Sequence, residues 1–78
     1  MRNKINSIAF IVPCLNEGKN VSLFMNHVLK IRERDPKTVY RVMFVDDGST
    51  DGSPEIMRAL AKEYIDVSYV LLTRNFGA

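Results

Sequence analysis

The chain has 78 residues, which is enough for one small domain. Its 46% apolar and 26% charged residues are typical of a globular protein. Eleven basic and nine acidic residues give a net charge of +2, which does not indicate a nucleic-acid partner. Cys14 is the only cysteine, so an intrachain disulfide is excluded and a reducing, cytoplasmic compartment fits best. No apolar run approaches the roughly 20 residues that span a bilayer.

The first third of the chain predicts a strand and then a helix. Residues 8–12 (IAFIV) are apolar and rich in β-branched types, which favours a strand covered on both faces. Asn16 and Asn20 are candidate N-caps of a helix over residues 20–34, which ends at Asp35-Pro36 because the residue before a proline avoids helical geometry. The apolar face of this helix has the spacing i, i+3, i+4, i+7, i+8 and comprises Val21, Phe24, Met25, Val28 and Leu29.

The rest of the chain repeats this alternation. Residues 40–45 (YRVMFV) predict a second strand, with Asp46 and Asp47 directly after it. Ser53-Pro54-Glu55 predicts a helix start with Ser53 as the capping residue. The apolar face of this second helix comprises Ile56, Met57, Leu60, Ala61 and Tyr64. A third strand over residues 67–72 leads into TRNFGA. Met25, Met43 and Met57 are expected to fill the core.

The element order predicts an α/β fold. Strands that alternate with helices imply right-handed crossovers and a parallel sheet. We expect a Rossmann-like βαβαβ half of a doubly wound domain, with a three-stranded parallel sheet in the order 3-2-1. Residues 1–78 would then form one incomplete domain, because the chain stops in the loop after the third strand.

The three unusual loops predict a ligand site. PCLNEG, DDGSTDGS and TRNFGA all follow strands, and ligands of such sheets bind outside the carboxyl ends of the strands. A carboxylate there can accept hydrogen bonds from the N–H groups of a base or from ribose hydroxyls. Successive strand residues point to opposite faces, so one of Asp46 and Asp47 should face a ligand while the other holds the loop 48–52. Asp51 and Ser53 are expected to cap a helix.

These residues also allow other interpretations. DDGSTDG is also a well-formed turn without any ligand. A calcium loop counted from Asp47 fails because its twelfth position is Arg58, and the glycine patterns of phosphate and dinucleotide loops are absent from the sequence. Cys14 is expected to be a small buried thiol and His27 a surface residue. Arg74 is left open between a diphosphate contact and a solvated loop.

Three segments carry a resemblance to a known family. IVPCLNEGKNV, FVDDGSTDGS and LLTRNFGA, in this order and spacing, resemble the N-terminus of family 2 glycosyltransferases. They are most similar to the branch that passes a hexose to a polyprenyl or dolichyl phosphate, which includes bactoprenol glucosyltransferases. The resemblance implies a GT-A fold whose first half binds the nucleotide. It places Asp47 at the base edge with Asp46 beside it, and the residues that wall the base and ribose would be Pro13, Leu15, Asn16 and Glu17.

The resemblance also implies partners and a cofactor. The donor would be a UDP- or GDP-sugar, the acceptor a polyprenyl phosphate, and the full enzyme would use a divalent metal, Mg or Mn, at the cytoplasmic face of the membrane. The family's metal ligands and catalytic base come later than these residues, so no catalytic residue is assigned and the chain alone is expected to be inactive. The alternative is a non-catalytic assembly module or remnant that forms a homodimer by strand pairing through the exposed edge of strand 8–12.

Overall fold

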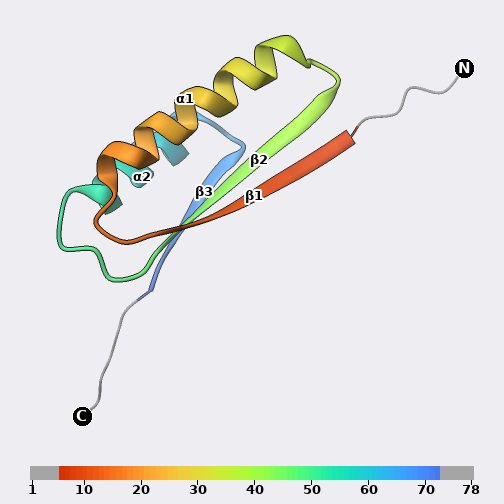
Figure 1. The fold of residues 1–78 in the computed structure, drawn as a ribbon. Coiled ribbons are helices and arrows are strands. Elements are labelled where there is room, and N and C mark those ends of the chain that lie inside the picture. Colours follow the sequence, from red (N-terminus) through yellow and green to blue (C-terminus); the bar gives the residue numbers. More distant parts are fainter. Residues whose placement is uncertain (1–5, 73–78) are drawn as a thin grey trace, which may run out of the picture.

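The computed structural model describes residues 6–72. Its elements are β1 (Asn6–Cys14), α1 (Gly18–Arg34), β2 (Thr38–Asp46), α2 (Ser53–Glu63) and β3 (Val67–Leu71). The three strands form one parallel sheet in the order β1-β2-β3 (Figure 1), which confirms the predicted α/β class and sheet order. Arg74 and the rest of the segment 73–78 lie outside the described residues, so the predictions for this loop are untested.

The register aligns the carboxyl ends of the strands. β1 pairs with β2 along its whole length, and β3 joins β2 from Val67, opposite Val42, to its own end. Cys14, Asp46 and Leu71 therefore stand in one row across the sheet. The two described loops that follow β1 and β2 consequently start side by side at the same edge.

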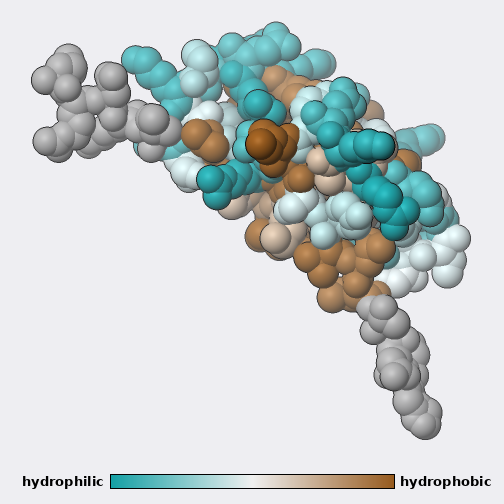
Figure 2. Space-filling model, turned by 180° about the vertical axis from the view of Figure 1, so that it is seen from behind, coloured by the Kyte–Doolittle hydropathy of each residue, from teal (hydrophilic) through white to brown (hydrophobic). Residues whose placement is uncertain are grey.

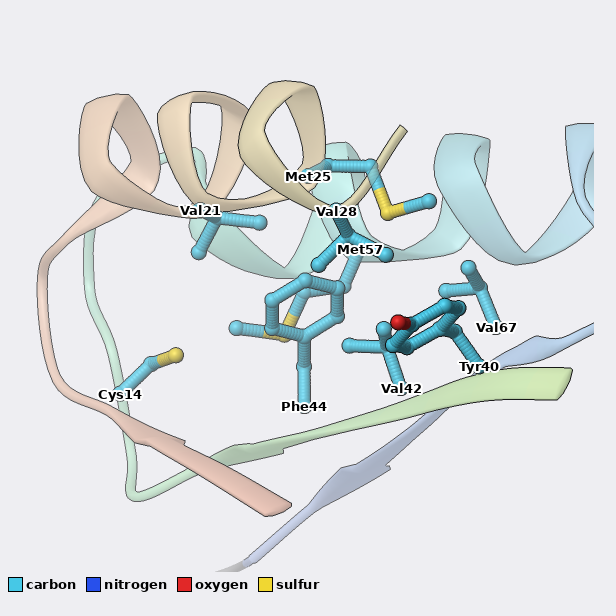
Figure 3. Packing of buried hydrophobic residues seen from close by; sticks show 9 residues of the cluster. All are labelled: Cys14, Val21, Met25, Val28, Tyr40, Val42, Phe44, Met57 and Val67. Carbon is cyan, nitrogen blue, oxygen red and sulfur yellow. The ribbon is translucent and has the colours of Figure 1, made fainter. Parts of the chain in front are cut away.

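Both helices cover one face of the sheet (Figure 1). Right-handed crossovers that run in the same direction place their helices on the same side. Figure 3 shows side chains of the strands and helices meeting between the two layers. This buried core comprises Cys14, Val21, Met25, Val28, Tyr40, Val42, Phe44, Met57 and Val67. At its centre, Phe44 is fully buried and contacts Phe24 edge to face, with 6.2 Å between ring centroids.

The opposite face of the sheet is exposed among residues 6–72. Ile11 is 62% exposed and Met43 is 36% exposed, because alternate strand residues point away from the helices. The expectation that strand 8–12 is covered on both faces is therefore not met by the described residues, and the assignment of Met43 to the core is wrong. An apolar groove of about 580 Å³ crosses this face near Ile11, Met43 and Ile65. Figure 2 shows further hydrophobic surface at the end of β3.

The helix ends differ in part from the prediction. α1 begins at Gly18 with Glu17 at the N-cap position, so the prediction of Asn16 or Asn20 as the cap is wrong. Its end at Arg34, just before Asp35, is confirmed. α2 begins at Ser53 itself, with Gly52 at the N-cap position, so Ser53 is not the capping residue.

Candidate functional site

Backbone hydrogen bonds extend the sheet one residue beyond the strand ends. The N–H of Asp47 donates to the carbonyl oxygen of Cys14 at 2.9 Å, and the N–H of Leu72 donates to the carbonyl oxygen of Asp46 at 2.8 Å. The start of the loop after β2 is therefore held against both neighbouring strands. This hydrogen-bonded row supports the side chains of the candidate site.

Asp46 holds the loop that follows it. Its side chain is on the helix face of β2 and the residue is only 3% exposed. One carboxylate oxygen accepts a hydrogen bond from the N–H of Ser49 at 2.9 Å, and the other accepts one from the Ser49 hydroxyl. The structure thus confirms that one aspartate of the pair ties down the loop 48–52, and it identifies that aspartate as Asp46.

Asp47 lines an open pocket at the carboxyl edge. The pocket has a volume of about 210 Å³, and its other lining residues are Pro13, Cys14, Leu15 and Glu17. Four of the six residues expected at a nucleotide are thus brought together around one opening. Leu15 is 47% exposed and supplies an apolar surface there, while Asp47 and Glu17 supply carboxylates.

Asn16 makes contacts that the sequence did not indicate. Its φ of 52° is in the left-handed region, which asparagine tolerates better than most residues. Its side-chain oxygen accepts hydrogen bonds from the N–H groups of Thr50 at 2.8 Å and Asp51 at 3.2 Å. Its own N–H donates to the Ser49 hydroxyl at 2.8 Å. Asn16 therefore joins the loop after β1 to the loop after β2, and it is not among the residues that line the pocket.

Asp51 links the starts of both helices. Its carboxylate accepts hydrogen bonds from the N–H and the hydroxyl of Ser53, at the beginning of α2. The N–H of Gly18, at the beginning of α1, lies 3.5 Å from its other oxygen. These bonds, first among them the one from the Ser53 hydroxyl, hold the pKa of Asp51 below its usual value. Asp51 thus accepts a backbone N–H of the first turn of α2, but it is not at the N-cap position, which Gly52 occupies, so the expected helix-capping role is not confirmed.

The two helix starts approach each other closely at Gly18. A Cβ atom at this position would lie 3.0 Å from the Cδ1 atom of Ile56 and 3.4 Å from the Ser53 hydroxyl oxygen. A side chain there would require the Ile56 methyl group to shift by a few tenths of an ångström.

Cys14 is buried, as expected. Its thiol lies 3.4 Å from the carbonyl oxygen of Val12. Burial, with smaller effects from the charges of Glu17 and Asp46, raises the pKa of the Cys14 thiol. A thiol with a raised pKa is a poor nucleophile at neutral pH. His27 is exposed on α1, which confirms its expected surface position.

The described residues do not fit a divalent metal. Within residues 6–72, no group of three or more His, Cys, Asp or Glu side chains is placed to hold a metal ion. Both carboxylate oxygens of Asp46 are engaged by Ser49, so this residue is poorly suited as a ligand. None of the helices within residues 6–72 has the length and apolar character needed to cross a membrane.

A parallel α/β sheet with polar loops at its carboxyl edge is a ligand-binding architecture. Residues 9–78 match the family model described as glycosyl transferase family 2, and the chain belongs to this family. The structure is similar to the mannosyltransferase PcManGT from Pyrobaculum calidifontis, solved in complex with GDP-Man and Mn²⁺, with a TM-score of 0.63 and 25% sequence identity. The alignment covers 96% of this chain and 22% of that one. The fold is thus the Rossmann-like part of a GT-A domain.

Relatives in the family are identical to this chain at about a third of the aligned positions. The bactoprenol glucosyl transferase of Shigella phage SfX is 36% identical over 70 residues, which is 90% of this chain and 23% of that protein. The undecaprenyl-phosphate 4-deoxy-4-formamido-L-arabinose transferase of Aeromonas hydrophila is 34% identical over 74 residues, or 94% of this chain and 22% of that protein. The glycosyltransferase AglE of Haloferax volcanii is 31% identical over 78 residues, which is 100% of this chain and 25% of that protein. The chain thus spans a quarter or less of these relatives.

Proposed function

We propose that this chain is the nucleotide-recognition part of a glycosyltransferase that transfers a hexose from a UDP- or GDP-sugar to a polyprenyl phosphate. The observation that carries the proposal is the pocket at the carboxyl edge, where Pro13, Leu15, Glu17 and Asp47 come together. The names of the relatives support the transfer to a polyprenyl phosphate, and the GDP-Man complex of the structural neighbour supports the nucleotide sugar.

In this proposal, Asp47 recognises the base. Its carboxylate accepts hydrogen bonds from the N–H groups of the base edge, and each hydrogen bond to a charged group contributes about 1.5–3 kcal/mol. Leu15 covers the ring with its exposed apolar side chain, and Pro13 and Glu17 form the wall beside the base and ribose. Asn16, expected in the same wall, lies next to this lining.

We place the groups that transfer the sugar outside residues 6–72. A divalent metal, Mg or Mn, would neutralise the diphosphate of the donor, and the structural neighbour was solved with Mn²⁺. Because the described residues do not fit a metal site, we assign neither a metal ligand nor a catalytic residue among them. We therefore expect residues 1–78 alone to bind nucleotide without transferring sugar, as one part of an enzyme at the cytoplasmic face of the membrane.

Calorimetric titration of the chain with UDP and with GDP tests the proposal. Each titration is run with and without Mg²⁺ or Mn²⁺, and circular dichroism establishes that the chain is folded. We expect one nucleotide to bind and Asp47→Asn to weaken its binding about tenfold or more, which corresponds to about 1.4 kcal/mol. Asp66→Asn is the matched control, because Asp66 lies away from the carboxyl edge beside Arg32. Binding of neither nucleotide, or equal binding by the Asp47→Asn variant, would overturn the proposal.

A second candidate function is assembly through the edge of β1. In the sheet of residues 6–72, β1 is an edge strand, and its side chains include Ile8, 42% exposed, and Ile11, 62% exposed. An unprotected apolar edge favours strand pairing with a second copy. Sedimentation equilibrium from micromolar to near-millimolar concentration would detect such a homodimer. Ile11→Lys should abolish the homodimer, whereas Leu23→Lys, at an exposed position of α1, should leave it intact. A monomer at every concentration would exclude this function.

A further inference from the structure

Hydrogen bonds between residues far apart in sequence cross-link the loops after β1 and β2. Asn16 contacts Ser49, Thr50 and Asp51, and Gly18 contacts Asp51, over separations of 33 to 35 residues. The links run in both directions, because Asn16 accepts from the second loop and Asp51 accepts from the first. The two loops therefore form one unit at the carboxyl edge.

Asn16 is suited to this position by two separate properties. Its backbone is in the left-handed region, with φ 52°, where an alanine would be strained and a glycine would not. Its carboxamide oxygen accepts the N–H groups of Thr50 and Asp51. The first property depends on the backbone and the second on the side chain, so suitable substitutions separate them.

The segment 47–51 is held from both sides. Asp46 accepts from Ser49 on the side of the sheet, and Asn16 holds Ser49, Thr50 and Asp51 on the side of the first loop. The Ser49 hydroxyl connects the two sides, because it accepts from the Asn16 N–H and donates to Asp46. Asp47 is at the start of this segment and lines the pocket.

We propose that Asn16 is a positioning residue that orders the segment 47–51 and thereby orients Asp47 for a nucleotide. This inference rests on the proposed function for its effect on binding. Asn16 acts through the loop and does not need to contact the nucleotide. Without its side-chain oxygen, the N–H groups of Thr50 and Asp51 lose their acceptor and the segment samples other conformations.

Three variants separate the side chain from the backbone. Asn16→Gly keeps the left-handed backbone without strain and removes the acceptor oxygen. Asn16→Asp keeps an acceptor oxygen and tolerates the left-handed region. Asn16→Ala removes the acceptor and adds strain. Thermal unfolding followed by circular dichroism identifies the variants that remain folded, and Asn16→Gly and Asn16→Asp are both expected to do so.

Two readouts are measured on the 78-residue chain and its variants. The first is hydrogen exchange of the Thr50 and Asp51 amides by NMR without ligand, and the second is the Kd for UDP and GDP by calorimetry. We expect Asn16→Gly to exchange these amides about tenfold faster and to weaken nucleotide binding by a similar factor, since both amides lose their acceptor. Asn16→Asp should restore protection and most of the affinity.

The outcomes distinguish this inference from the proposed function. If the parent chain binds UDP or GDP and Asn16→Gly binds it equally well, the positioning role is overturned while the proposed function stands. If the parent binds neither nucleotide, the proposed function fails, and amide exchange alone decides whether Asn16 orders the loop. Unchanged exchange in Asn16→Gly overturns the inference in either case.

Discussion

Replacing Asp46 by alanine should remove much of the stability of the domain. Asp46 is 3% exposed, and its two carboxylate oxygens accept the N–H and the hydroxyl of Ser49. Hydrogen bonds to a charged acceptor contribute about 1.5–3 kcal/mol each, so the two together amount to about 3–6 kcal/mol. Ser49 is partly exposed, and water can replace some of the lost bonding. We therefore expect the free energy of unfolding to fall by about 3 kcal/mol.

This loss is large for so small a domain. At about 0.05–0.15 kcal/mol per residue, a chain of this length has a free energy of unfolding of about 4–12 kcal/mol. Urea unfolding followed by circular dichroism measures the change as a lower midpoint with an unchanged slope. The matched control is Asp66→Ala, because the carboxylate of Asp66 lies 3.9 Å from Arg32 in a partly exposed ion pair. Such pairs contribute about 1 kcal/mol or less.

The comparison of Asp46→Ala with Asp66→Ala tests whether the hydrogen bonds to Ser49 stabilise the domain. If Asp46→Ala loses no more stability than Asp66→Ala, the hydrogen bonds to Ser49 do not stabilise the loop, and the assigned role of Asp46 is wrong. A change of slope in Asp46→Ala would show instead that the substitution alters how much surface unfolding exposes.

Three further outcomes are expected. Phe44→Ala should lower the free energy of unfolding, measured in urea, by about 3–5 kcal/mol. Met43→Ala, on the exposed face of the sheet, should lower it by about 1 kcal/mol or less. Equal effects of the two substitutions would contradict the assigned faces of β2. Because the pKa of Asp51 is lowered in the fold, the ionised carboxylate stabilises the domain fully above its usual pKa, and this stabilisation disappears as the pH falls through the lowered value. Asp51→Asn should therefore lose less stability on the acid side when unfolding is measured as a function of pH. An unchanged pH profile in this variant would contradict the role of Asp51. Cys14 should react with a disulfide reagent about tenfold or more slowly in the native chain than in urea, and equal rates would show that the thiol is accessible.

Local sequence patterns predicted the elements but not all of their ends. The apolar positions at helical spacing on α1 are those that pack on the sheet, and Asp35-Pro36 ends α1 as expected. The prediction of Asn16 or Asn20 as a helix cap was wrong because an asparagine side chain can also form hydrogen bonds elsewhere. Asn16 bonds instead to a loop 33 to 35 residues away. No local pattern reveals such a contact.

The candidate site was predictable in outline because parallel strands bring their carboxyl ends to one edge. This rule placed the loops PCLNEG and DDGSTDGS near each other, and the resemblance to the family named Pro13, Leu15, Glu17 and Asp47 within them. The pocket has these four residues in its lining. The alternation along the strand predicted that Asp46 and Asp47 differ in role but did not say which of them holds the loop, and only the resemblance placed Asp47 at the base edge. Which of them holds the loop depends on which face of β2 the helices cover, and that follows from the handedness of both crossovers.

By itself, the sequence determined the order of strands and helices, the apolar faces and the position of polar loops after strands, because these depend on residue spacing along the chain. Only the tertiary structure decided that Asp46 is buried while Asp47 lines the pocket, that Met43 is outside the core and that Asn16 joins the two loops. These properties depend on which segments meet in space. Packing and hydrogen bonding between distant segments outweigh the local preferences of any single residue, so they were set by the fold.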